Sequence, residues 1–344
     1  MIGRLSHIFP RLASAVTTAA VLSGMLSCER RPLEDQDFNT DIRVRVNVNA
    51  IANVTMDVYN DKIPLPKIDP EVMHVLFFDK GTENVVSEAY INEVSIEEGQ
   101  TVFCGKLSIV PGDYEMLIYN FGTESTLIRD PRSFSKAEAY TNTVSDNILS
   151  RYKSKTGENE AVVYEPDHLL VASSENEVIP YHQGVYTVRA EAKSIVESYY
   201  LQIKVDGLQY VSGAQAFLSG MNSANFIARN EKVEDPAATV YFNLVKSDDK
   251  GVPVICAVFN TFGRIENSSN ELAVTFDLRT TDGRTVKKTF DLSELFLSEA
   301  CVKHHWLLLD ETITIDPPEN PGTGGGGFAP DIDDWNEEHR DIEI

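Results

Sequence analysis

The clearest chemistry in this 344-residue chain lies in Leu22–Cys28, which reads Leu-Ser-Gly-Met-Leu-Ser-Cys. Arg4 and Arg11 form a basic lead, and an apolar, small-residue run from Leu12 to Leu26 follows, as in an export signal. A peptidase that cuts before a cysteine needs small or apolar residues there, and the Cys28 thiol is then the nucleophile that takes up a diacylglycerol. The sequence predicts a lipoprotein signal peptide over residues 1–27 and lipidation at Cys28.

A membrane-spanning helix is the alternative for this segment. The run is only about 15 residues long and contains Ser, Thr and Gly, whereas a spanning helix needs about 20 apolar residues. Lipoprotein acylation anchors a chain almost permanently and leaves the polypeptide in water. Residues 28–40 are polar and suit a spacer, in which Glu34-Asp35-Gln36-Asp37 is either a surface-export cue or a plain solvated linker.

Other residues that suggest chemistry do not form sites. His304 and His305 are adjacent, so on a strand they point to opposite faces and cannot chelate one ion. The acidic stretch after residue 330 lacks the glycine and the twelve-residue spacing of an EF-hand. Gly324–Gly327 has no Gly-Lys-Ser/Thr after it, and Ser219 lacks the glycines of a nucleophile elbow. We expect no metal, no cofactor and no enzyme activity.

Four aromatic residues have two possible roles, ligand binding or core packing. Tyr199, Tyr200, Tyr210 and Trp306 are candidates to stack sugars, but aromatics of a core or sheet face need no ligand. We favour the core interpretation.

Charge limits the class of partner. The chain has a formal charge of −23, and loss of residues 1–27 leaves 28 basic and 53 acidic residues, a charge of −25. Nucleic acid is excluded as a partner because phosphate binding needs basic patches. The three remaining cysteines, Cys104, Cys256 and Cys301, are widely spaced and odd in number, unlike a disulfide framework. We expect buried free thiols in strands, with one disulfide among the three as the alternative.

Almost every periodic segment has period two. Ile42, Val44, Val46 and Val48 alternate with polar residues, which is typical of a strand with one buried face, and Met73–Phe78 is apolar throughout, as in a central strand. Thr281-Asp282-Gly283-Arg284 between apolar runs predicts a hairpin. Helical periodicity is limited to Phe134–Tyr140 and Leu292–Glu299. The chain is therefore predicted to be all-β, with a pair of β-sandwiches.

Breaks in the pattern define the expected domains. Ser174-Glu175-Asn176-Glu177 is a charged break before a new set of strands, so we divide the β region into 41–180 and 181–316. Residues 317–327 are a flexible Pro/Gly linker, and 328–344 form a C-terminal tail.

Several motifs together resemble one family. They are the Cys28-Glu-Arg-Arg-Pro-Leu start, Val110-Pro-Gly-Asp-Tyr, Tyr119-Asn-Phe-Gly-Thr-Glu124, Asp167-His-Leu-Leu-Val-Ala172, Val205-Asp-Gly-Leu-Gln-Tyr-Val211, Leu218-Ser-Gly-Met221 and the Gly-Gly-Gly-Gly-Phe…Asp-Asp-Trp tail. The chain from Cys28 to Ile344 resembles the fimbrillin-like lipoproteins of Bacteroidales, in particular their anchor or minor-subunit branch. The resemblance implies two tandem transthyretin-like β-sandwich domains, lipid anchoring at the cell outer membrane with surface exposure, and participation in a fimbria.

One departure from that family bears on function. Its polymerising members are cut by an arginine-directed protease that removes the first strand. Here Arg43 and Arg45 lie inside the alternating strand, and a cut at Arg30 or Arg31 would release the chain from its lipid. This arrangement favours an anchor that keeps its lipid.

The tail keeps apolar groups at regular positions. Phe328, Ile332, Ile342 and Ile344 are even-numbered, so an extended tail directs them to one face and Trp335 to the other. We interpret these five residues as partner-binding in a donor strand that enters a neighbouring subunit, with folding back on its own domain as the alternative.

Two hypotheses follow. The first is a non-enzymatic, lipid-anchored fimbrial anchor or accessory subunit whose partners are other fimbrial subunits, bound by strand addition. The second is a surface lipoprotein that binds a glycan or a host protein through sandwich loops.

Overall fold

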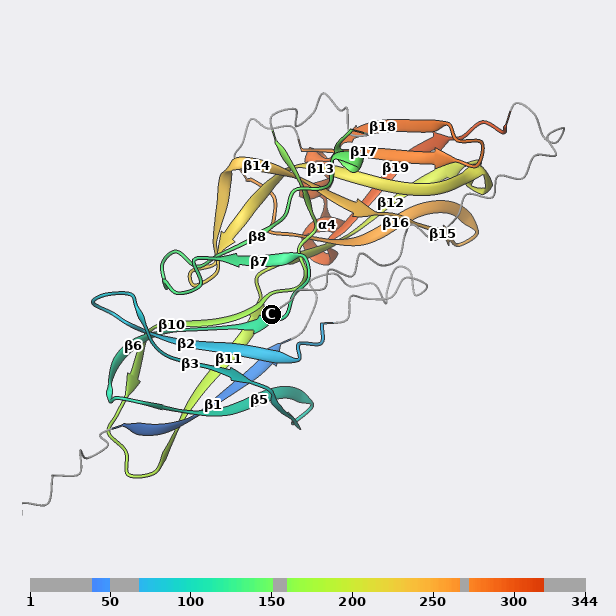
Figure 1. Cartoon of the computed structure of the whole chain (residues 1–344). Helices are drawn as coiled ribbons and strands as arrows, with labels where there is room; N and C mark the ends of the chain where they lie inside the picture. The colour runs from blue at the N-terminus through green and yellow to red at the C-terminus, as the bar shows by residue number, and fades with distance from the viewer. Residues whose placement is uncertain (1–38, 50–67, 151–159, 267–271, 319–344) are drawn as a thin grey trace, which may run out of the picture.

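A computed structural model describes residues 39–49, 68–150, 160–266 and 272–318. Its elements are strands joined by turns, with a few helices of at most six residues, so the all-β prediction is confirmed. The helices are α2 (Asp146–Leu149), η1 (Leu208–Tyr210), α3 (Ser293–Leu297) and α4 (Glu299–His304). Figure 1 shows two stacked bodies, a first unit at the lower left and a second unit at the upper right.

The first unit is an eight-stranded sheet in the order β3-β2-β6-β10-β11-β1-β5-β4. Its strands are β1 (Thr40–Asn49), β2 (Val72–Asp79), β3 (Val85–Ile91), β4 (Glu93–Glu97), β5 (Gln100–Ile109), β6 (Gly112–Phe121), β10 (Leu170–Ile179) and β11 (Val185–Ser194). The strands at its two ends, β3 and β4, are almost continuous in sequence, so the sheet curls round on itself. Gly105 permits this closure, because a Cβ there would lie 2.7 Å from Cβ of Ile91.

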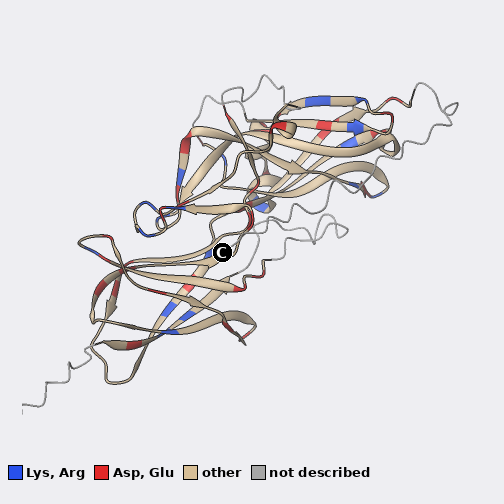
Figure 2. Cartoon of the chain, viewed as in Figure 1, with Lys and Arg blue, Asp and Glu red and all other residues tan. Residues whose placement is uncertain are grey.

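The burial of β1 and β2 is as predicted from the sequence. Every second side chain of β1 is buried, and the six residues Met73–Phe78 of β2 are buried completely. Arg43 and Arg45 lie on the outer face of β1, opposite Lys106 of β5 and Arg189 of β11 respectively. Figure 2 colours the Lys and Arg positions of these strands blue, together with others on β17 and β18.

The second unit is a sandwich of two sheets. The seven-stranded sheet follows the order β18-β17-β13-β14-β9, with β8 beside β13 and β7 beside β8. Its strands are β7 (Thr126–Arg129), β8 (Glu138–Thr141), β9 (Ala161–Tyr164), β13 (Val211–Phe226), β14 (Glu231–Asn243), β17 (Ala273–Thr280) and β18 (Thr285–Asp291). The four-stranded sheet has the order β15-β16-β12-β19. It consists of β12 (Glu197–Asp206), β15 (Val245–Asp249), β16 (Val252–Thr261) and β19 (Trp306–Thr314).

The two sheets of the second unit enclose its core. The rings of Phe242 on β14 and Phe259 on β16 stack at 4.1 Å between ring centroids and 7° between planes. Strands β17 (Ala273–Thr280) and β18 (Thr285–Asp291) form the hairpin predicted from Asp282-Gly283.

Chain order and sheet membership differ from the predicted division. Strands β7–β9 join the second unit, the chain then returns for β10 and β11, and β11 pairs in parallel with β1. The expected boundary at residue 180 therefore falls between two strands of one sheet, and the first unit extends to Ser194. The charged break Ser174–Glu177 lies inside β10, where the pairing with β6 shifts register.

A separate hydrophobic cluster joins the two units. The outer face of the first sheet contributes residues of β2, β6 and β10, and the second unit contributes residues that precede β8 or follow β13 and β16. Phe78 and Phe134 are fully buried there, with ring centroids 5.7 Å apart. The segment Phe134–Tyr140, for which we expected helical structure, instead supplies this buried ring and leads into β8. We call this cluster the junction core.

Candidate functional site

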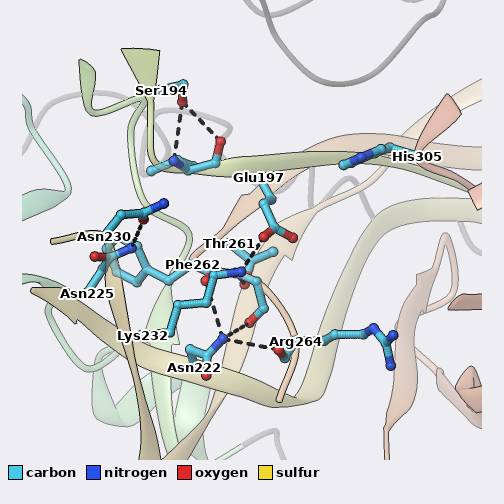
Figure 3. A network of polar contacts seen from close by, with 12 residues as sticks. Ser194, Glu197, Asn222, Asn225, Asn230, Lys232, Thr261, Phe262, Arg264 and His305 are labelled. Atoms are coloured by element: carbon cyan, nitrogen blue, oxygen red, sulfur yellow. Dashed lines mark hydrogen bonds and ion pairs between the residues drawn. The ribbon is translucent and has the colours of Figure 1, made fainter. Parts of the chain in front are cut away.

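A polar cluster lies in the second unit where β12 begins, and Figure 3 shows Glu197, Lys232, Asn222, Arg264 and His305 of this cluster. Glu197, the first residue of β12, accepts a hydrogen bond and an ion pair from Nζ of Lys232 on β14. The hydroxyl of Tyr199 donates to the other carboxylate oxygen of Glu197 at 2.6 Å. Both oxygens of the carboxylate therefore have partners.

These contacts decide the charge states. Burial disfavours the charged form of Glu197, but the hydrogen bonds from Lys232 and Tyr199 outweigh it and hold the carboxyl pKa below its ordinary value. Burial, together with the nearby Glu197 carboxylate, raises the pKa of Tyr199 far above its ordinary value. Glu197 is therefore an anion and Tyr199 a fixed donor across the physiological range.

Backbone geometry makes room for the ion pair. Gly263, just after β16, has φ of +93°, and a Cβ there would lie 2.7 Å from Oε1 of Glu197 and would also collide with Nζ of Lys232. The side-chain amide of Asn222 holds the same loop by donating to the carbonyl oxygens of Phe262, Gly263 and Arg264 at 3.3, 2.8 and 3.2 Å. The loop that carries Arg264 is thereby fixed to β13.

Arg264 and His305 complete the wall of a hollow of about 320 Å³. The guanidinium carbon of Arg264 lies 5.9 Å from the ring centroid of Phe296. The His305 ring stacks on Tyr199, with centroids 4.7 Å apart, and its Nδ1 lies 3.0 Å from the carbonyl oxygen of Ser198. The lining residues are Glu197, Tyr199, Lys232, Arg264, Glu266 and His305.

This arrangement suits polar binding better than catalysis. The nearest thiol, Cys301, is buried, and burial raises its pKa to about 11, so it stays protonated and unreactive. The carboxylate of Glu197 already accepts two hydrogen bonds, which leaves it a poor general base. Arg264 and His305 remain as groups that a polar ligand would contact.

The site residues predicted from the sequence are not among the residues that the structure describes. Cys28 and the tail residues Phe328, Ile332, Trp335, Ile342 and Ile344 are outside the described residues. His304 stacks on Trp306 at 4.4 Å while His305 stacks on Tyr199, so the adjacent histidines do face different partners. In the part of the chain that the structure describes, no group of three or more His, Cys, Asp or Glu side chains is placed to hold a metal ion.

The aromatic candidates are part of the protein's own packing. Tyr199, Tyr200 and Trp306 are buried, and Tyr210 packs against the core of the second unit, so the core interpretation is confirmed. Cys104, Cys256 and Cys301 are free thiols, although Cys301 lies on α4 and not on a strand.

Sequence reasoning missed the hollow itself. Its residues come from β12, β14, the loop after β16 and the turn after α4, so they span more than a hundred positions without a common motif. The sequence feature that came closest to indicating the hollow was Gly263. An isolated glycine after an apolar run indicates a tight turn, but it does not indicate a ligand site.

Among the helices of the described chain, none has the length and hydropathy needed to cross a bilayer. A curated protein of Bacteroides ovatus, named "Putative fimbrium anchoring subunit Fim4B", is 25% identical over 298 residues, which cover 78% of this chain and 83% of that protein. In fold, the chain is similar to the crystal structure of a putative adhesin from Bacteroides ovatus, with a TM-score of 0.57, 21% identity and coverage of 86% of this chain and 98% of the other.

A family model described as "Domain of unknown function (DUF5119)" matches residues 47–243. This range takes in most of the first unit and the strands β7–β9 and β12–β14 of the second, which is more than half of the chain. The chain therefore belongs to the DUF5119 family.

Proposed function

We propose that this protein is a non-enzymatic, lipid-anchored fimbrial anchor or accessory subunit that associates with other fimbrial subunits by β-strand addition. The observation that carries this proposal is the similarity to a relative named as a fimbrium anchoring subunit, which extends over 78% of this chain and 83% of the relative. We place the protein in the cell envelope and, more specifically, at the outer membrane with its polypeptide exposed on the cell surface. In this proposal the two units act as tandem transthyretin-like sandwiches.

Lipidation at Cys28 supplies the anchor. The sequence before Cys28 has the basic lead, apolar run and small residues of a lipoprotein signal, and the spacer then leads into β1. Arg43 and Arg45 lie within β1 between two hydrogen-bonded neighbours, β5 and β11, so a protease would have to open the sheet to reach the peptide bonds beside them. This protection supports an anchor that retains its first strand.

The tail supplies the proposed contact with another subunit. Strand addition needs an extended segment with alternate side chains for pockets, and Phe328, Ile332, Ile342 and Ile344 have that spacing. The last described strand, β19, lies at the edge of the four-stranded sheet, and the described chain ends shortly after it, at Pro318.

Two variants test the two parts of the proposal. Cys28→Ala should move the protein from the outer-membrane fraction to a soluble fraction, because it removes the acylated thiol. A chain that ends at residue 327 should stay folded and membrane-bound but should no longer co-purify with fimbrial subunits.

Each part of the proposal also has an outcome that would contradict it. Continued sedimentation of Cys28→Ala with washed membranes contradicts lipid anchoring. If the truncated chain loses several kcal/mol of folding stability while each folded molecule still binds subunits, the tail belongs to its own sandwich and donation is wrong.

A further inference from the structure

Exposed apolar side chains gather at the end of the first unit where β1 begins. Val110, Val178, Tyr181 and Val185 are 57%, 50%, 61% and 48% exposed. They are four of the fourteen large hydrophobic residues that the described chain exposes most, and all four lie in one unit, in the β5–β6 and β10–β11 turns or at the strand ends beside them. We call these four residues the apolar tip.

Strand pairing brings these turns together. Thr40, the first residue of β1, pairs with Ile109, so Val110 follows at the same end of the sheet. On the other side of β1, Asp41 pairs with Val185 of β11. Exposed residues that are far apart in sequence therefore surround the start of β1.

Hydrogen bonds hold the turn between β10 and β11 against the same point. The Thr40 hydroxyl donates to the carbonyl oxygen of Pro180 at 2.9 Å and accepts from the backbone N–H of His182 at 3.3 Å. Tyr181 lies between these two contacts. In Figure 1 this turn forms the lower end of the molecule, away from the second unit.

The chain enters the first unit at this tip. Thr40 is twelve residues after Cys28, and twelve extended residues span at most about 40 Å. If Cys28 carries lipid, the start of β1 is the described part of the protein joined to the bilayer by the shortest stretch of chain.

We propose that the apolar tip inserts into the headgroup and acyl boundary of the membrane that holds Cys28. The inference rests on the lipid anchoring in the proposed function. Tyrosine favours this boundary because its ring is apolar and its hydroxyl polar, and buried apolar area supplies the binding. The tip then orients the first unit against the membrane and directs the second unit outward.

The charges beside the tip set the character of the contact. Asp41 and Asp113 are exposed and flank Val185 and Val178 through strand pairing. Their carboxylates keep the insertion shallow and give no attraction to anionic lipids. The contact is therefore apolar, and added salt should not release it.

The test uses the lipidated full-length protein in phosphatidylcholine vesicles. An environment-sensitive fluorophore is placed on Gln183→Cys, in the tip turn, in a Cys104→Ser background. The matched control label is Lys250→Cys in the exposed turn between β15 and β16. At position 183 we expect the fluorophore emission to shift to the blue on vesicle binding and to be quenched by brominated lipids, and high salt should change neither effect. At position 250 we expect neither effect.

Substitutions make the result specific to the tip. Tyr181→Asp should abolish the quenching at position 183, while Val245→Asp, at another exposed apolar site on β15, should leave it intact. Both proteins should still sediment with vesicles through their lipid. Sedimentation without quenching at position 183 overturns the tip contact alone, and loss of sedimentation overturns the lipid anchor and the tip contact together. Quenching that salt abolishes contradicts an apolar contact.

Discussion

The carboxyl group of Glu165 lies where the chain crosses from β9 in the second unit to β10 in the first. It accepts a hydrogen bond from the backbone N–H of Asn260 at 3.1 Å, and the Asn260 side chain donates to the carbonyl oxygen of Pro166 at 3.0 Å. Burial raises the Glu165 pKa to about 7, against the lowering effect of the Asn260 N–H and with help from the Asp167 carboxylate. This crossing therefore contains a carboxyl group that titrates near neutral pH.

A raised pKa makes folding stability depend on pH. The folded state holds the Glu165 proton more tightly than the unfolded state, whose pKa is near the ordinary 4.5. The resulting stability is complete below that value and is lost as pH rises through about 7. We predict that Glu165→Gln, which keeps a neutral acceptor, raises the free energy of unfolding by about 1–3 kcal/mol at pH 8 and has little effect at pH 4.5.

Urea unfolding at the two pH values measures this difference. The exposed Glu124→Gln is the control and should change stability equally at both. An equal effect of Glu165→Gln at both pH values would mean that the Glu165 pKa is the same in the folded and unfolded states, which contradicts the raised pKa.

At the scale of elements, local sequence predicted what each strand buries but not which strand it joins. Alternation in β1, continuous burial in β2 and the β17–β18 turn follow from side-chain periodicity and turn residues, and the structure contains all three. The parallel pairing of β1 with β11 joins residues more than 140 positions apart, and no local pattern specifies such a partner.

The same limit explains the two local errors. Glu175 and Asn176 indicated a break because both are exposed and polar, yet a register shift in β10 accommodates them without ending the strand. The apolar spacing of Phe134–Tyr140 suggested a helix, but Phe134 and Ala137 reach the junction core from the turn before β8 and Ala139 reaches it from β8 itself. The hollow beside Glu197 depends on four separated elements and was therefore beyond sequence reasoning.

The β17–β18 hairpin gives a prediction at this scale. Gly283 has φ of +84°, its N–H donates to the Thr280 carbonyl at 3.0 Å, and Asp282 accepts from Nε of Arg284 at 2.7 Å. A side chain is strained at such a φ, so Gly283→Ala should lower the free energy of unfolding by about 1–2 kcal/mol. Gly81→Ala, in an exposed turn without a positive φ, is the control and should change it little. Thermal unfolding of both variants provides the comparison, and equal melting temperatures would contradict the role of the turn.

For the whole molecule, the junction core determines whether the two units fold separately. The described chain passes between the units three times, after β6, after β9 and after β11, and the junction core buries apolar residues from both. Domains that share a modest interface move and unfold independently, but a large hydrophobic interface couples them. We therefore expect one cooperative unit, and not the two protease-resistant fragments that a linker near residue 180 would give.

Two adjacent phenylalanines on β2 separate these alternatives. Phe77 and Phe78 are both fully buried, but Phe77 faces the core inside the first unit, whereas Phe78 faces the junction core. Truncation of a buried Phe to Ala costs about 3–5 kcal/mol through lost burial and the cavity left behind. If the units unfold together, Phe77→Ala and Phe78→Ala should each lower the midpoint of a single urea transition by similar amounts, with circular dichroism and tryptophan fluorescence coincident. If the units are independent, Phe77→Ala should shift the first unit alone, and Phe78→Ala should leave each unit nearly as stable as before.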